Sequence, residues 1–190
     1  MFEYEEKYLL TENEYEILYL TADNFEEQFV QKNYYYDTDC LKFNKTGITL
    51  RIREKNGKYE ATVKSHSPNV ENCSTEKTKK AVNSLDADAF GIEGLRLYGV
   101  LTTLRTIIYR DSNIEIALDK NTYSGHTDYE LEIEYTEGHY EYVSKFMFAY
   151  NELLKNKLLK AETSLSKRSQ TNKSKSSRFF AYKTKNEVMI

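Results

Sequence analysis

The sequence predicts a mainly β protein of the α+β class, in which helices lie beside antiparallel strands. At least five segments alternate apolar and charged residues with period two, which is typical of strands. A single proline and seven glycines in 190 residues leave room for long, uninterrupted strands. We therefore expect residues 1–190 to form one domain, with the C-terminal part at 163–190 its least well-defined part.

The first half of the chain begins with an expected strand at residues 2–10. Thr11 and Glu14 then have the spacing of a capping box, which predicts a short helix ending near Leu20. The aromatic segment 33–38 predicts a further strand, which carries one acid, Asp37, at its end. The charged face of the first strand carries Glu3, Glu5 and Lys7.

Residues 48–54 and 59–65 predict a β-hairpin, because Asn56-Gly57 favours the positive φ angles of a tight turn. Bases gather on one face of this hairpin, namely Arg51, Arg53 and Lys64. The following residues, 67–99, are less regular. They show only weak helical periodicity, near 75–82 and 86–90.

Strand character returns at residues 101–109 and 113–119, and a glutamate-rich strand follows at 129–135. Residues 139–159 have the spacing of a helix whose apolar stripe covers the apolar face of the sheet. Beyond a Ser/Lys-rich segment, residues 178–182 are aromatic enough to predict a last strand. The charged faces of these strands carry Arg105, Asp119, Glu130, Glu132 and Glu134.

The placement of this charged face decides the architecture. On an ordinary antiparallel sheet the charged side faces water and the apolar side faces the core. Here acids and bases segregate onto different strands instead of mixing, which favours a barrel with the ionic side enclosed and helices outside. The charge pattern alone does not decide between an open sheet and a closed barrel.

An enclosed face of this kind suits a phosphorylated ligand. Glu130, Glu132 and Glu134 stand in one row about 7 Å apart, and such carboxylates repel one another unless cations neutralise them. Oxygen ligands of this type favour Mg²⁺ or Mn²⁺, which share their coordination with phosphates. Arginines and lysines would bind an anion with several phosphates through charge-assisted contacts.

The charged positions resemble the CYTH superfamily, also called triphosphate tunnel metalloenzymes. The segment Glu3-Tyr4-Glu5-Glu6-Lys7 matches the E-x-E-x-K signature on the first strand of that family. Further matches follow in the family's order, at Tyr36-Asp37-Thr38, Leu50-Arg51-Ile52-Arg53, Lys64, Arg105, Leu118-Asp119 and the row from Glu130 to Glu134. The resemblance spans residues 2–135 and extends to 175–179, and it is closest to bacterial adenylate-cyclase-like and thiamine-triphosphatase-like members.

The resemblance implies a closed antiparallel barrel of about eight strands that forms a tunnel. It implies a triphosphate substrate held with Mg²⁺ or Mn²⁺. Implied metal ligands are Glu3, Glu5, Glu132 and Glu134, with Glu130 on the same face. Implied phosphate-binding bases are Lys7, Arg51, Arg53, Lys64, Arg105, Lys175 and Arg178. Asp37 and Asp119 match supporting acids, and Lys7, Glu5 and Glu132 are the implied catalytic residues.

The leading hypothesis is metal-dependent cleavage of a phosphoanhydride bond of a triphosphate, with inorganic triphosphate first and nucleoside or thiamine triphosphate next. No Ser, Cys or His nucleophile is required for such a reaction. One alternative is a class IV-type adenylate cyclase that makes cyclic AMP from ATP. Another is a non-catalytic binder of polyphosphorylated ligands. Lys7 also has two interpretations, either as a partner of Glu5 or Glu3 on its strand or as a phosphate ligand.

The composition of the chain limits the kinds of binding partner that we expect. The formal net charge of −3, from 27 Lys+Arg against 30 Asp+Glu, gives no reason to expect nucleic-acid binding. No apolar run approaches the roughly 18 residues of a membrane span, and no signal peptide is evident. We expect a cytoplasmic protein with a small-molecule triphosphate as its partner, and a homodimer is left open.

Overall fold

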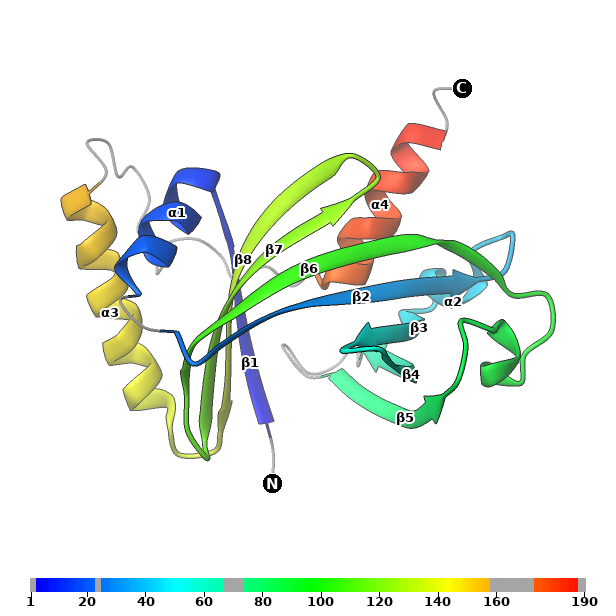
Figure 1. The fold of residues 1–190 in the computed structure, drawn as a ribbon, viewed down its shortest axis with the longest axis horizontal. Helices are drawn as coiled ribbons and strands as arrows, with labels where there is room; N and C mark the ends of the chain where they lie inside the picture. Colours follow the sequence, from blue (N-terminus) through cyan, green and yellow to red (C-terminus); the bar gives the residue numbers. More distant parts are fainter. Residues whose placement is uncertain (1–2, 23–24, 67–73, 158–172, 188–190) are drawn as a thin grey trace. The chain divides into compact units, whose positions relative to one another are not determined.

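The computed structural model describes residues 3–22, 25–66, 74–157 and 173–187 (Figure 1). Its elements in chain order are β1 (Glu3–Leu10), α1 (Glu12–Thr21), β2 (Glu27–Asp37), α2 (Lys42–Lys45), β3 (Ile48–Lys55), β4 (Lys58–His66), β5 (Ser74–Val82), the 3₁₀ helix η1 (Ala87–Phe90), β6 (Arg96–Arg110), β7 (Ile114–Tyr123), β8 (His126–Thr136), α3 (Tyr140–Lys157) and α4 (Lys175–Glu187).

The strands form one eight-stranded sheet in the order β1-β8-β7-β6-β2-β3-β4-β5. This confirms the mainly β, antiparallel class with flanking helices. The expected closure into a barrel is not found, because the order of hydrogen-bonded strands among the described residues has two ends, β1 and β5. All eight residues of β1 pair with β8, and β5 pairs with β4. In this strand order, each of the two end strands therefore has one neighbouring strand.

The chain divides into two compact units. Unit 1 comprises residues 1–28, 104–121 and 128–172, and unit 2 comprises residues 29–103, 122–127 and 173–190.

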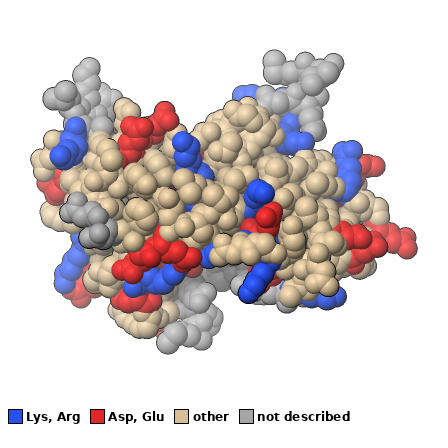
Figure 2. Space-filling view, in the orientation of Figure 1, with Lys and Arg blue, Asp and Glu red and all other residues tan. Residues whose placement is uncertain are grey.

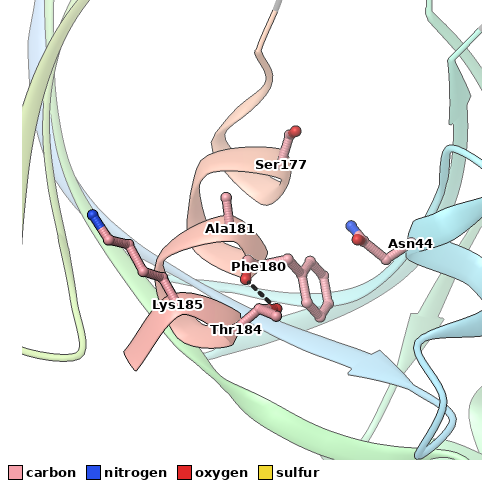
Figure 3. A pocket seen from close by; sticks show the side chains of 6 residues that line it. All are labelled: Asn44, Ser177, Phe180, Ala181, Thr184 and Lys185. Atoms are coloured by element: carbon pink, nitrogen blue, oxygen red, sulfur yellow. Dashed lines mark hydrogen bonds between the residues drawn. The ribbon is translucent and has the colours of Figure 1, made fainter. Parts of the chain in front are cut away.

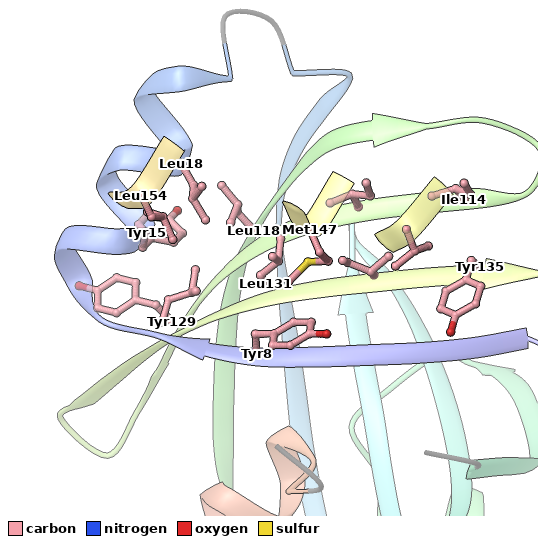
Figure 4. Packing of buried hydrophobic residues seen from close by; sticks show 14 residues of the cluster. Tyr8, Tyr15, Leu18, Ile114, Leu118, Tyr129, Leu131, Tyr135, Met147 and Leu154 are labelled. Atoms are coloured by element: carbon pink, nitrogen blue, oxygen red, sulfur yellow. The ribbon is translucent and has the colours of Figure 1, made fainter. Parts of the chain in front are cut away.

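In unit 1, α1 and α3 cover the apolar face of the strands (Figure 4). The capping box of α1 is present, because the Glu14 carboxylate accepts from the Thr11 backbone N–H at 2.7 Å and the Thr11 hydroxyl accepts from the Glu14 N–H. Val143, Met147 and Leu154 recur with helical spacing on α3 and are buried against the strands, as the sequence predicted. Leu158, at the end of the expected stripe, lies outside the described residues.

In unit 2, strands β2, β3 and β4 have an apolar layer on each face. Leu50, Ile52 and Ala61 form one layer, together with side chains from the segment that leads to β6. The opposite face carries α4, whose Phe179 ring lies 4.9 Å from that of Tyr35 on β2. The side chains of β2 alternate accordingly, because Tyr36 belongs to the first layer and Tyr35 to the second.

One expectation for unit 2 is wrong, and one segment that the sequence left unassigned is now placed. Residues 178–182 were expected to form a last strand, but they belong to helix α4. Phe179 and Phe180 are neighbours and both are buried in one cluster, which a strand with alternating faces cannot achieve. Residues 75–82 have weak helical periodicity but form strand β5, because β4 supplies a partner strand along their whole length.

We predict that Phe179→Ala detaches α4 from unit 2. Phe179 is fully buried, and removing a buried phenylalanine ring costs about 3–5 kcal/mol. Urea denaturation should show a loss of this size, and hydrogen exchange should show faster exchange across residues 175–187. The matched control is Lys185→Ala, an exposed position on the same helix. Equal protection of α4 in both variants would contradict this account of how the helix is held.

Candidate functional site

The glutamate row lies on β8 in unit 1, as the sequence predicted. On β1, the Cα partners of Glu132 and Glu134 are Lys7 and Glu5. Five consecutive residues of β8, Tyr129 to Ile133, are buried, so both faces of this strand are covered. An open sheet with a solvated charged face would expose every second residue. The acidic face of β8 is therefore not directed into bulk solvent.

Two groups of three carboxylates meet at Glu132. One oxygen from each of Glu5, Glu132 and Glu134 lies within 4.8 Å of the others, and the same holds for Asp119, Glu130 and Glu132. Glu130 and Asp119 are 0% exposed and Glu132 is 5% exposed. All five residues offer carboxylate oxygens, and such a set fits a hard divalent cation such as Mg²⁺ or Mn²⁺.

Arg105 on β6 supplies a positive charge to these acids. Its Nε and Nη2 donate to the two carboxylate oxygens of Asp119 at 2.8 and 2.6 Å, and Nη2 also donates to Glu132 Oε1 at 2.5 Å. Burial lowers the pKa of Arg105, but Glu132 and Asp119 outweigh this effect and hold that pKa well above its usual value. A side chain expected to bind phosphate is thus engaged by carboxylates in this structure.

Lys7 forms an ion pair with Glu5 on the same strand. Both side chains are only partly exposed to solvent. This contact matches the interpretation of Lys7 as a partner of Glu5, and it places an ammonium group beside the first group of carboxylates. Each of the two groups therefore has a basic side chain of unit 1 in contact with one of its members.

Glu134, a member of the first group of carboxylates, has a pKa that departs from its ordinary value. Burial, together with the nearby charges of Glu132 and Glu5, raises the pKa of Glu134 to about 7, although Arg105 acts in the opposite direction. A buried carboxyl next to other carboxylates is easier to protonate, because the neutral form avoids both desolvation and repulsion.

The remaining predicted bases belong to unit 2. Arg51 and Arg53 lie on β3, Lys64 on β4, and Lys175 and Arg178 on α4. Burial raises the pKa of the Tyr35 hydroxyl, while Arg51, Lys175, Arg53 and Arg178 act in the opposite direction. All four cations are therefore near enough to this buried tyrosine to affect its pKa, although α4 was expected to be a strand.

The supporting acids have distinct surroundings. Asp119 holds Arg105, as described above. Asp37 accepts backbone N–H groups of Thr38, Phe43 and Asn44 at 2.7, 3.1 and 2.8 Å, so it anchors the backbone at α2. The side chain of Glu3 lies outside the described residues, although its backbone pairs with Thr136 on β8.

Sequence reasoning left Glu115 on β7 without a role. Its carboxylate lies 3.6 Å from Arg105 and 2.8 Å from Arg110, which in turn contacts Glu27 at 3.1 Å. Glu115 shares a strand face with Asp119, four residues away, and this parity is the signal that could have identified it. The ion pairs thus continue from Glu132 through Arg105 and Glu115 toward the surface of unit 1.

A pocket of about 640 Å³ lies beside α4, lined by Asn44, Ser177, Phe180, Ala181, Thr184 and Lys185 (Figure 3). None of the site residues predicted from the sequence lines it. On the face shown in Figure 2, acidic and basic side chains lie interspersed instead of gathering by sign. Within the described residues, the helices are too short or too polar to cross a membrane.

Comparisons with a family model and with a curated protein assign this chain to the same family. Residues 1–167 match the CYTH domain. The chain is 29% identical over 154 residues to "Putative triphosphatase YjbK" of Bacillus subtilis (strain 168), a match that covers 72% of this chain and 79% of that protein.

Solved structures show the same fold. A Bacillus halodurans protein described as a "putative adenylate cyclase" is 25% identical, with a TM-score of 0.67 over 94% of this chain and 97% of that one. HpAC1 from Hippeastrum, a "putative adenylyl cyclase" described as having a dominant triphosphatase activity, is 21% identical, with a TM-score of 0.62 over 82% and 88%.

We predict that Glu134 makes the metal-free protein less stable as the pH rises. With a pKa of about 7 in the folded state against an ordinary 4.5, folded Glu134 binds a proton that the unfolded chain releases. Its contribution to stability is therefore lost between about pH 4.5 and pH 7. Melting curves in EDTA should show that Glu134→Gln, relative to wild type, gains a few degrees in Tm from pH 5 to pH 8. A constant difference across this range would contradict the assignment.

Proposed function

Because the chain belongs to the CYTH domain family, we propose that it is a metal-dependent hydrolase that cleaves a phosphoanhydride bond of a triphosphate. The observation that carries this proposal is the sharing of Glu132 between two groups of carboxylates, each within 4.8 Å. The family is generally metal-dependent, and the relative from Bacillus subtilis bears the name of a triphosphatase. Inorganic triphosphate is the first candidate substrate, followed by nucleoside and thiamine triphosphates.

The proposed metal ligands are the carboxylates of unit 1. Glu5, Glu132 and Glu134 would hold one Mg²⁺ or Mn²⁺ ion, and Asp119, Glu130 and Glu132 are the corresponding set for a second. Glu3 is retained as a further ligand from its place in the E-x-E-x-K motif. A divalent cation, when bound, would neutralise charge on phosphate oxygens and lower the pKa of a coordinated water.

The basic side chains of unit 1 have positioning roles in this proposal. Arg105 grips both oxygens of Asp119 and one oxygen of Glu132, which fixes the orientation of the Glu132 carboxylate. Lys7 forms an ion pair with Glu5, and we retain it as a contact for a phosphate oxygen. The bases of unit 2 listed above are proposed as further phosphate contacts.

Two other activities use the same residue types. An adenylate cyclase is favoured by the description of the Bacillus halodurans relative. It would convert ATP to cyclic AMP and pyrophosphate, so product analysis with ATP and Mn²⁺ separates it from a hydrolase. A non-catalytic binder would be stabilised by triphosphate and metal without releasing phosphate.

We predict that Glu132→Gln lowers metal-dependent phosphate release by at least about 100-fold, because one substitution weakens both groups of carboxylates. Phosphate release should be measured with inorganic, nucleoside and thiamine triphosphates in Mg²⁺ and in Mn²⁺. Glu141→Gln is the matched control, since Glu141 is an exposed acid on α3 that pairs with Lys145. A correctly folded Glu132→Gln variant with wild-type turnover would remove the proposed metal site.

A further inference from the structure

Thr62 on β4 is a buried hydroxyl that the proposed function does not use. Its side chain is 0% exposed, and among the described residues its Oγ1 atom has no hydrogen-bond partner. Burying a hydroxyl without a partner costs free energy, so native proteins seldom do this away from water or ligand sites. The environment of Thr62 indicates what its partner would be.

The alternation of β4 fixes the face on which Thr62 lies. Ala61 and Val63 pack in the apolar layer with Leu50 and Ile52, so Thr62 points to the opposite face of the sheet. Helix α4 covers that face, because the Ser176 hydroxyl lies 3.0 Å from the hydroxyl of Thr49 on β3, in a buried contact. Thr62 therefore belongs to the side of the hairpin that faces α4.

This side of unit 2 is strongly basic. The Cα partner of Thr62 on β3 is Arg51, and Lys64 stands two residues further along the same face of β4. Arg51 is also the Cα partner of Tyr35, the tyrosine acted on by four cations of β3 and α4. One acid, Glu60, shares this face of β4, and it pairs with Arg53 two residues along the ladder from Thr62.

We propose that the Thr62 hydroxyl donates a hydrogen bond to a phosphoryl oxygen of an anion bound beside Arg51 within unit 2. The surrounding bases select an anion over a cation, and a hydroxyl donor suits an oxyanion better than an apolar group. This inference rests on the proposed function only in taking the anion to be part of a triphosphate. In this proposal Thr62 contributes to binding of the anion and has no part in the hydrolytic step.

The test is a comparison of wild type, Thr62→Val and Thr62→Ser by isothermal titration calorimetry with inorganic triphosphate and with pyrophosphate, both without divalent metal. Valine has the shape of threonine but cannot donate, and serine retains the hydroxyl. Thr62→Val should weaken binding about tenfold or more, because hydrogen bonds to charged groups are the strong ones. Thr62→Ser should bind within about threefold of wild type.

Melting temperatures separate this role from a structural one. Thr62→Val should melt at or above the wild-type temperature, because the free protein gains nothing from the hydroxyl. Thr49→Val is the matched control, a buried threonine on the same side of the hairpin whose hydroxyl has a partner, and it should melt lower. Thr62→Ala replaces the valine variant should valine disturb the fold.

Several outcomes would overturn the inference. These are equal binding by wild type and Thr62→Val, a lower melting temperature of Thr62→Val with unchanged binding, or no binding of either probe by wild type. Failure of the proposed function looks different. Wild type would then bind the probes, and Thr62→Val would bind them weakly, while neither released phosphate in the presence of metal.

Discussion

The candidate site depends on the hydrogen bonds and ion pairs that Arg105 forms with Asp119 and Glu132. Three acids of β7 and β8, Asp119, Glu130 and Glu132, are almost fully buried within a few ångströms of one another. Burying unpaired like charges is among the most unfavourable arrangements in a protein. A guanidinium with a fixed fork of donors satisfies two carboxylates at once, which a lysine at this position could not do with the same geometry.

The same constraint gives a physical reason for a metal. Arg105 contributes one positive charge to Asp119 and Glu132, and Lys7 contributes one to Glu5. Burial and the negative charges of Glu132 and Glu5 together raise the pKa of Glu134 to about 7. A divalent cation would stabilise this cluster more than it would stabilise dispersed surface acids, because the folded chain already holds these carboxylates close enough to repel one another.

The sequence was most informative where a pattern is local. Period two identified the glutamate row of β8, and the spacing of Thr11 and Glu14 identified the start of α1. Partners distant in the chain were not visible in this way. The sequence of residues 178–182 predicts a strand, but both Phe179 and Phe180 pack against the Tyr35 ring, a contact that the sequence does not reveal. The sequence of β5 is weakly helical in its periodicity, but pairing with β4 makes it a strand.

Asp37 matched a family position, yet its bonds to the backbone at α2 come from a turn that the sequence alone does not specify. The sequence predicted Arg105 as a phosphate-binding base, whereas the coordinates show Asp119 and Glu132 as its partners.

The central claim is that the carboxylates around Glu132 in unit 1 form a divalent-cation site. The most direct measurement is anomalous X-ray scattering from crystals grown with Mn²⁺. The account predicts an anomalous peak coordinated by Glu132 together with Glu5 and Glu134, or with Asp119 and Glu130. Manganese bound only to exposed acids, with no metal at Glu132, would contradict it.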